Sequence, residues 1–228
     1  MDRNPILCAI DTQDRARAEA LIAATAGAVG GVKLGLEFFA AHGPEGIRKA
    51  AGGQKNVFLD LKLHDIPNTV AGAVKSALTL DPLLLTIHCS GGPAMMRAAA
   101  EARGSARTKI VGVTVLTSLD DNDLTAVGQS APAAAQVKRL ALLAQASGLD
   151  GVVCSPQEVA MLREACRKDF LLIVPGIRPA GAAVGDQKRV QTPRDAIAAG
   201  ADYLVIGRPI TEAPDPGAAA RAIVAEIP

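Results

Sequence analysis

The sequence is organised around the segment Val57-Phe58-Leu59-Asp60-Leu61-Lys62-Leu63-His64-Asp65-Ile66-Pro67-Asn68-Thr69-Val70. It begins as an apolar strand, yet charged side chains follow where a buried strand accommodates them least. Because successive side chains of a strand alternate between its faces, Asp60 and Lys62 are expected to share one face. Asp65 follows beside a proline turn and is expected on a loop or at the start of a helix, so it need not serve the same pocket from the same chain.

Short apolar segments alternate with Ala-rich helical segments along the whole sequence. The expected strands are Ile6–Ile10, Gly31–Leu34, Val57–Leu61, Leu83–Ile87, Ile110–Leu116, Gly151–Cys154, Phe170–Val174 and Tyr203–Ile206. The expected helices include Arg15–Ala26, Thr69–Leu80, Pro93–Ala102 and Ala133–Ala146. Continuous apolar strands alternating with helices are typical of a parallel sheet covered by helices. Eight such repeats without a low-complexity linker favour an α/β fold, a (β/α)8 TIM barrel with residues 1–228 as a single domain, over an open doubly wound sheet.

The composition excludes several classes of function. With 24 basic and 23 acidic residues the net charge is +1, so no polyanionic partner is indicated. Aromatic residues make up 2% of the chain and Trp is absent, which removes the stacking platforms of single-strand nucleic-acid binders. No apolar run reaches the roughly 18 residues that a membrane span needs, and the N-terminus lacks the apolar core of a signal peptide. We therefore expect a cytoplasmic protein that binds neither nucleic acid nor membranes.

Metal binding and disulfide formation are not indicated either. The four cysteines have no C-x-x-C spacing and are expected to be structural; they are Cys8, Cys89, Cys154 and Cys166. The three histidines lack a second histidine at ligand spacing, so none is expected to be a metal ligand or the acid of a reaction; they are His42, His64 and His88.

Nearly every expected strand carries a polar residue at the same end. These residues are Asp11, Lys33, Asp60, Lys62, His88, Thr117, Ser118, Arg178 and Arg208. In a barrel the active site lies at the carboxyl ends of the strands, so these side chains should meet. Taken alone, Asp60 and Lys62 would form an ordinary ion pair. Asp11, Lys33, Asp60, Lys62 and Asp65 would form an alternating array of charges around the barrel mouth. In that array an ammonium is held between carboxylates, which keeps Lys62 protonated and able to deliver a proton.

The last two strand-to-helix turns have the character of a phosphate site. Gly207 lets a backbone N–H approach an anion closely, and Arg208 supplies a fork of donors. The preceding loop, Arg178–Arg189, is rich in small residues and flanked by basic ones, so it is suited to folding over an anion. The alternative for Arg208 is a solvated side chain after a glycine turn.

The run from Phe58 to Val70 resembles the signature of the orotidine 5'-phosphate decarboxylase family, whose members make UMP in pyrimidine synthesis. The resemblance continues in order through Ala9-Ile10-Asp11, Val32-Lys33-Leu34-Gly35, Ile87-His88-Cys89-Ser90-Gly91-Gly92, Val115-Leu116-Thr117-Ser118, Pro175-Gly176-Ile177-Arg178-Pro179, Gly185-Asp186-Gln187 and Ile206-Gly207-Arg208-Pro209-Ile210. It implies decarboxylation of orotidine 5'-monophosphate to UMP and CO2, the last step of de novo UMP synthesis, without a metal or an organic cofactor.

The resemblance also implies a role for each site residue. Lys62 would protonate C6 of the pyrimidine as carbon dioxide leaves, and Asp60 would lie against the departing carboxylate. The implied catalytic residues are Lys62, Asp60, Asp65 and Lys33. The implied substrate-binding residues are Asp11, Lys33, Asp65, Ile66, Thr69, Thr117, Ser118, Arg178, Gln187, Gly207 and Arg208.

Within that second set the contacts differ. Asp11 and Lys33 would bind ribose hydroxyls, and Thr117 or its neighbour Ser118 would contact the pyrimidine. The phosphate would be held by Arg178, Gln187, Gly207 and Arg208. Asp65 and Thr69 would reach the site of the neighbouring subunit, which implies an obligate homodimer.

Two rival interpretations remain open from the sequence. Keto-gulonate-phosphate decarboxylase and hexulose-phosphate synthase share the barrel and the D-x-K-x-x-D spacing, but they use magnesium, so the same carboxylates would be metal ligands. The Arg178 to Gln187 loop, which resembles a nucleotide-binding loop, disfavours them. A non-catalytic phosphate-binding barrel is the second rival, and the intact set Asp60, Lys62, Asp65 and Arg208 disfavours it.

Overall fold

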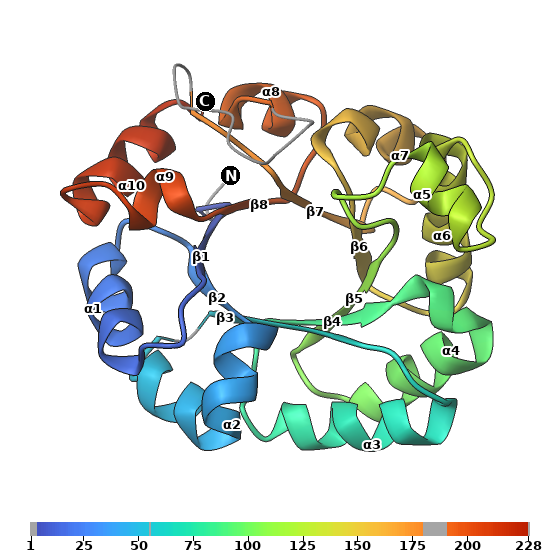
Figure 1. Ribbon diagram of the computed structural model, residues 1–228, viewed down its shortest axis with the longest axis horizontal. Coiled ribbons are helices and arrows are strands. Elements are labelled where there is room, and N and C mark those ends of the chain that lie inside the picture. Colours follow the sequence, from blue (N-terminus) through green and yellow to red (C-terminus); the bar gives the residue numbers. More distant parts are fainter. Residues whose placement is uncertain (1–3, 55, 180–190, 228) are drawn as a thin grey trace.

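Eight parallel strands close into a barrel, in the order of the sequence (Figure 1). The computed structural model describes residues 4–54, 56–179 and 191–227. The strands are β1 Ile6–Ile10, β2 Gly31–Gly35, β3 Val57–Leu63, β4 Leu84–His88, β5 Lys109–Val113, β6 Gly151–Val153, β7 Leu171–Pro175 and β8 Tyr203–Ile206. The barrel closes where β1 pairs with β8, through Ile6 opposite Leu204. The predicted (β/α)8 barrel is therefore confirmed.

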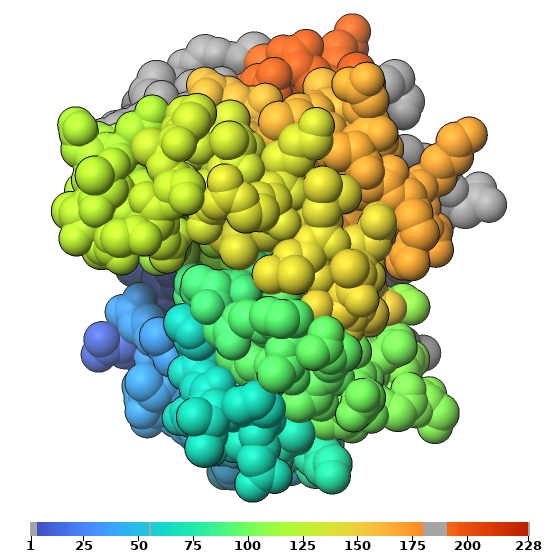
Figure 2. Space-filling model, turned by 90° about the vertical axis from the view of Figure 1, so that its right-hand side faces the viewer, coloured from blue at the N-terminus to red at the C-terminus, as the bar shows by residue number. Residues whose placement is uncertain are grey.

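Helices form a ring outside the strands, and Figure 2 shows this layer from the side of α4, α6 and α7. The α-helices are α1 Arg15–Thr25, α2 Leu36–Ala51, α3 Pro67–Leu78, α4 Gly92–Arg103, α5 Asp121–Ala126, α6 Ala133–Ala146, α7 Val159–Ala165, α8 Pro193–Ala198, α9 Arg208–Thr211 and α10 Pro216–Ala225. Two 3-10 turns are η1 Cys89–Gly91 and η2 Pro156–Glu158. No helix among the described residues is long and apolar enough to cross a membrane.

The alternation of strand side chains produces two apolar cores. In β1, Ile6, Cys8 and Ile10 belong to the large core between the strands and the helices. Leu7 and Ala9, which point the other way, belong to a small core inside the barrel. The inner core also contains Phe58, Leu84, Val111, Ile173, Tyr203 and Val205. This inner core lies inside the barrel, below the strand ends where the polar residues gather. The polar side chains therefore rest on packed apolar side chains.

Two strands differ from the predicted bounds in ways that matter for the site. β3 continues to Leu63, but Lys62 has a backbone φ of 51°, in the left-handed region. Its pairing with β4 also shifts register between Leu59 and Leu63, as at a β-bulge. β5 ends at Val113, so the prediction of a strand running to Leu116 was wrong. At the end of that strand the Thr114 hydroxyl donates to the carbonyl of Val153, and the following residues turn away from the ladder.

Candidate active site

Four charged side chains meet at the carboxyl ends of β1, β2 and β3. The Lys62 Nζ lies 2.7 Å from Asp60 Oδ2, and the Lys33 Nζ lies 3.8 Å from the same oxygen. Lys33 also binds Asp11 Oδ1 at 2.8 Å. Asp60 and Lys33 are buried, whereas Asp11 is exposed at the barrel mouth. Four members of the predicted array of alternating charges are thus brought together, with the Asp60 carboxylate between two ammonium groups. The fifth expected member, Asp65, is exposed and is not among the described residues that line the adjoining cavities.

Lys62 reaches Asp60 by a route that strand alternation alone does not describe. In a regular strand the two side chains would stand side by side, but the left-handed backbone at Lys62 and the register shift beside it re-aim the lysine. The hydroxyl of Thr86 on β4 holds this arrangement: it lies 2.9 Å from Asp60 Oδ1 and 2.8 Å from the backbone N of Lys62. Sequence reasoning missed Thr86, although a polar residue inside the apolar strand Leu83–Ile87 was a usable signal.

An apolar cavity of about 160 Å³ adjoins the charged cluster. Its lining consists of Lys33, Phe58, Asp60, Lys62, Val113, Val115, Leu116, Thr117, Val153, Cys154, Pro175 and Val205. The largely apolar lining suits a ring with apolar faces, and Lys33, Asp60 and Lys62 place charges beside it. Of the two predicted pyrimidine contacts, Thr117 lines this cavity, whereas Ser118 is not among the described residues that line it.

A second, more polar cavity of about 430 Å³ shares Lys33, Pro175 and Val205 with the first. It is lined by Ala9, Asp11, Lys33, Pro175, Gly176, Arg178, Val205, Gly207, Arg208 and Glu212. The ends of β7 and β8 thus bring Arg178 and Arg208 to one space, as predicted from the sequence. Such a pair of guanidinium groups favours an anion. Gln187, the other predicted phosphate ligand, lies outside the described residues.

The segment between β3 and α3 lies at the surface. Residues 64–69 are exposed, and Ile66 has 67% of its surface accessible. The Asp65 carboxylate accepts a hydrogen bond from the backbone N of Ile66 at 2.6 Å. Neither Asp65, Ile66 nor Thr69 is among the described residues that line the two cavities of this chain.

Two histidines lie beside the cluster. The rings of His64 and His88 are tilted, with their centroids 5.4 Å apart. Burial lowers the pKa of His88, and the nearby positive charges of His64 and Lys62 lower it further. Among the described residues no group of three or more His, Cys, Asp or Glu side chains is arranged to hold a metal ion.

The four cysteines are free and buried. Burial raises the pKa of the Cys8 and Cys89 thiols to about 12, and it raises the pKa of Cys154 and Cys166 as well. A buried thiol that stays protonated is a poor nucleophile, which agrees with the predicted structural role.

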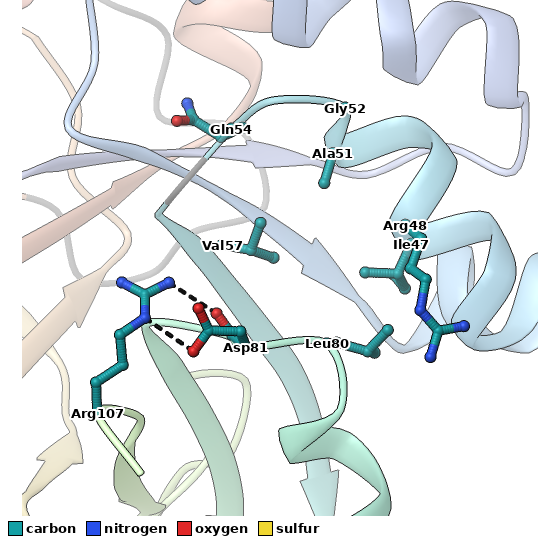
Figure 3. Close-up of a pocket in the computed structure, with 9 residues that line it drawn as sticks. All are labelled: Ile47, Arg48, Ala51, Gly52, Gln54, Val57, Leu80, Asp81 and Arg107. Atoms are coloured by element: carbon teal, nitrogen blue, oxygen red, sulfur yellow. Dashed lines mark hydrogen bonds and ion pairs between the residues drawn. The ribbon is translucent and has the colours of Figure 1, made fainter.

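A further cavity of about 490 Å³ lies at the opposite end of the barrel, where the strands begin (Figure 3). Its lining is formed by Ile47, Arg48, Ala51, Gly52, Gln54, Val57, Leu80, Asp81 and Arg107. The Arg107 guanidinium binds both the Asp81 carboxylate, at 2.9 Å, and the Asp81 backbone oxygen, at 2.8 Å. This cavity contains none of the predicted site residues, and Arg107 secures the turn at Asp81.

Charged side chains at the carboxyl ends of the strands, next to one apolar and one arginine-lined cavity, place the molecule among the barrel enzymes that bind phosphorylated substrates. The chain belongs to the orotidine 5'-phosphate decarboxylase / HUMPS family, whose sequence model matches residues 4–223. The family recognised from the sequence, and with it the predicted type of enzyme, is therefore confirmed.

Individual relatives agree over almost the full chain. The chain is 54% identical to orotidine 5'-phosphate decarboxylase of Paramagnetospirillum magneticum, covering 98% of each sequence. It is 54% identical to the enzyme of that name from Thermobifida fusca, covering 98% of this chain and 95% of the other. The crystal structure of orotidine 5'-phosphate decarboxylase from Lactobacillus acidophilus is similar with a TM-score of 0.86 and 37% identity, covering 98% of both chains.

Proposed function

We propose that this chain decarboxylates orotidine 5'-monophosphate to UMP and CO2, the last step of de novo UMP synthesis. The main support is the position of the Lys62 ammonium, which lies 2.7 Å from Asp60 at the wall of an apolar cavity. That cavity adjoins a second cavity lined by arginines. Family membership and the names of the relatives support the same substrate. In this proposal the whole chain, residues 1–228, acts as one catalytic domain.

The substrate would lie across both cavities. The pyrimidine would occupy the apolar one against Thr117, and the phosphate would bind Arg178, Gly207 and Arg208. Asp11 lines the second cavity and Lys33 lines both, and these two residues would contact the ribose hydroxyls. We assign Gln187 to the phosphate from the family resemblance alone.

Lys62 would act as the acid. The bond between C6 and the carboxylate breaks, carbon dioxide leaves, and the electron pair on C6 takes a proton from the Lys62 ammonium. Asp60 would lie beside the departing carboxylate, where two negative charges disfavour the bound substrate relative to the transition state. The same Asp60 faces Lys62 and Lys33, so it also favours the positive charge on the lysine.

The reaction would need neither a metal nor an organic cofactor. Asp60 is bound by the Lys62 ammonium, faces that of Lys33 and is hydrogen-bonded to Thr86, so a divalent cation at the carboxylate would be repelled by two positive charges. This argues against the magnesium-dependent sugar-phosphate chemistry of the wider superfamily. An array of this kind with two adjoining cavities also argues against a barrel that only binds phosphate.

Two subunits would complete each site. Asp65, Ile66 and Thr69 are exposed and are not among the described residues that line the two cavities of their own chain. We assign them to the site of a neighbouring subunit in a homodimer, where Asp65 would extend the charged array and Ile66 would be covered.

The reaction is tested directly by ultraviolet absorbance. Purified protein is mixed with orotidine 5'-monophosphate in the presence of a strong metal chelator, and loss of the orotate band and formation of UMP are followed. Turnover with chelator is the expected result. If the protein instead turns over a sugar phosphate, and only after magnesium is restored, Asp60 would be a metal ligand and the proposal would be overturned.

The shared site is tested by mixing two inactive variants, Lys62→Ala and Asp65→Ala. If Asp65 serves the neighbour, a mixed dimer has one site with both changes and one intact site. Random reassortment in a two-fold dimer then restores about a quarter of the wild-type activity. If Asp65 serves its own chain, every site carries one change and the mixture stays inactive.

A further inference from the structure

Thr86 occupies an unusual position, since it is a fully buried polar residue between the two central groups of the site. It lies on β4, has no solvent-accessible surface and is hydrogen-bonded to two residues of β3. One is the Asp60 Oδ1, at 2.9 Å, and the other is the Lys62 backbone N, at 2.8 Å. It is not among the described residues that line either cavity, so it acts from behind them.

The direction of both hydrogen bonds follows from the chemistry of the partners. A backbone N–H only donates and a carboxylate only accepts, whereas a hydroxyl has one hydrogen and two lone pairs. The Thr86 oxygen therefore accepts from Lys62, and its single hydrogen is committed to Asp60. Valine, which has the same shape without the hydroxyl, satisfies neither partner.

The first consequence concerns Asp60. With Oδ1 held by the Thr86 hydroxyl, Oδ2 is the oxygen turned toward the ammonium groups, 2.7 Å from Lys62 and 3.8 Å from Lys33. Without that bond the carboxylate keeps only its contacts with Lys62 and Lys33, and rotation about its Cβ–Cγ bond is less restricted. A small rotation at this position changes the distance between Oδ2 and the lysine that it must hold.

The second consequence concerns the backbone of Lys62. This residue has φ of 51° at the point where the ladder between β3 and β4 shifts register. The Lys62 N–H is satisfied by the Thr86 side chain instead of by a carbonyl of β4. The threonine hydroxyl thus secures the bulge from which the lysine projects.

We propose that Thr86 is a positioning residue that sets the geometry of the Asp60–Lys62 pair through one hydroxyl. The inference rests on the proposed function, in which Lys62 delivers a proton next to Asp60. The inference goes beyond that function because it assigns the alignment of Lys62 and Asp60 to a residue that does not touch the substrate.

The test compares Thr86→Val with Thr108→Val. Thr108 is also fully buried, and its hydroxyl donates to the carbonyl of Pro82 at 2.7 Å, but it lies at the opposite end of the barrel. We expect kcat of Thr86→Val to fall between about tenfold and about 100-fold, as for a displacement of about 1 Å at a reacting group. The dissociation constant for UMP should change far less, and Thr108→Val should retain kcat even where its melting temperature falls as much.

A second pair of variants guards against a folding defect in Thr86→Val. Thr86→Ser and Thr86→Ala both remove the methyl group and differ only in the hydroxyl. Serine should restore most of kcat, whereas alanine should show the deficit. A residue that only fills space would give the reverse dependence, on the methyl group and not on the hydroxyl.

The inference is overturned if Thr86→Val, or Thr86→Ala where valine fails to fold, turns over at the wild-type rate. It is also overturned if Thr86→Val loses kcat, UMP affinity and stability equally, or if Thr108→Val loses as much kcat as Thr86→Val. Wild-type protein run alongside separates the two proposals. An inactive wild type refutes the decarboxylase and the positioning role together, and an active wild type with an equally active Thr86→Val refutes the positioning role alone.

Discussion

The two ends of the barrel both carry ion pairs but connect them differently. At the end where the strands begin, the carboxylates bind the backbone: Asp150 Oδ2 accepts from the Ile110 N–H and Asp202 Oδ2 from the Leu172 N–H, at 2.9 and 2.7 Å. At the end where the strands finish, the hydrogen bonds of Asp60 among the described residues go to the side chains of Lys62 and Thr86.

The basic residues show the same contrast. Arg163 donates to the carbonyls of Gly200 and Phe170 as well as to Asp202. The ammonium of Lys33, in contrast, faces only the carboxylates of Asp11 and Asp60 among its charged partners in the described chain. Ion pairs that include the backbone fix the turns and stabilise the fold, whereas an array of side chains beside a cavity is available to a substrate. Mutations at the two ends should therefore separate activity from stability.

The largest effect is expected for Lys62→Ala. Loss of the proposed acid should lower kcat by at least about 1,000-fold, since general acid catalysis contributes factors of this order. The absorbance of orotidine 5'-monophosphate measures the rate, and circular dichroism with UMP titration checks fold and binding. The fold and UMP affinity should persist, because Asp60 keeps Lys33 and Thr86 as partners. Substantial remaining turnover would remove Lys62 from this role.

Asp150→Ala should produce the opposite pattern. The change leaves Arg103 and the Ile110 N–H without a carboxylate partner, and it should lower the free energy of unfolding by about 2–4 kcal/mol. Urea denaturation measures this loss, and kcat at a temperature where the variant is folded should be unchanged. Glu45→Ala is the matched control, because Glu45 pairs with Arg48 and Lys49 only at the surface and should cost less than about 0.5 kcal/mol. A loss of kcat in folded Asp150→Ala would contradict the division between the two ends.

Arg208→Ala tests the arginine-lined cavity. Loss of a charge-assisted contact to phosphate should cost about 1.5–3 kcal/mol, or roughly 10- to 150-fold in affinity. Inhibition constants of UMP and of uridine, which lacks the phosphate, measure the effect. The uridine constant should hardly change. Equal losses for both ligands would refute the phosphate assignment.

The smallest effect is expected from pH. The pKa of His88 is lowered in the folded protein, chiefly by burial, from an ordinary value near 6.5. Below pH 6.5 His88 becomes protonated in the unfolded chain but stays neutral in the folded chain, so protonation favours the unfolded state. The contribution of neutral His88 to the free energy of unfolding is therefore complete above pH 6.5 and is lost as the pH falls toward the lowered pKa. Urea unfolding at several pH values should show a shallower decline for His88→Gln than for the wild type. Identical slopes would exclude His88 as the cause.

The fold was predictable because each strand and helix carries its own local signal. β1 and β8 begin and end where the apolar runs do, and α6 coincides with the predicted Ala133–Ala146. The predicted charges at the strand ends also meet as expected, since parallel strands of a barrel end on one rim. β5 was predicted too long because Val115 and Leu116 are apolar for another reason: they line a cavity.

The finer geometry of the site was not predictable in this way. The bulge at Lys62 depends on how β3 pairs with β4, which a single strand pattern does not contain. Thr86 lies twenty-four positions from Lys62 along the chain, and only the pairing of β3 with β4 brings its hydroxyl to the Lys62 backbone N. Contacts between separate segments depend on how the strands pair in the folded barrel, and the local sequence pattern of one segment does not predict that pairing.

The left-handed backbone at Lys62 implies a conflict between stability and activity. A side chain in this region costs roughly 1–2 kcal/mol relative to glycine, so lysine is not the residue that would make the fold most stable there. Selection for stability alone would therefore replace it. Lys62→Gly should melt at a higher temperature than Lys62→Ala. If Lys62 is the acid proposed above, keeping lysine at this position exchanges part of the thermal stability of the fold for activity.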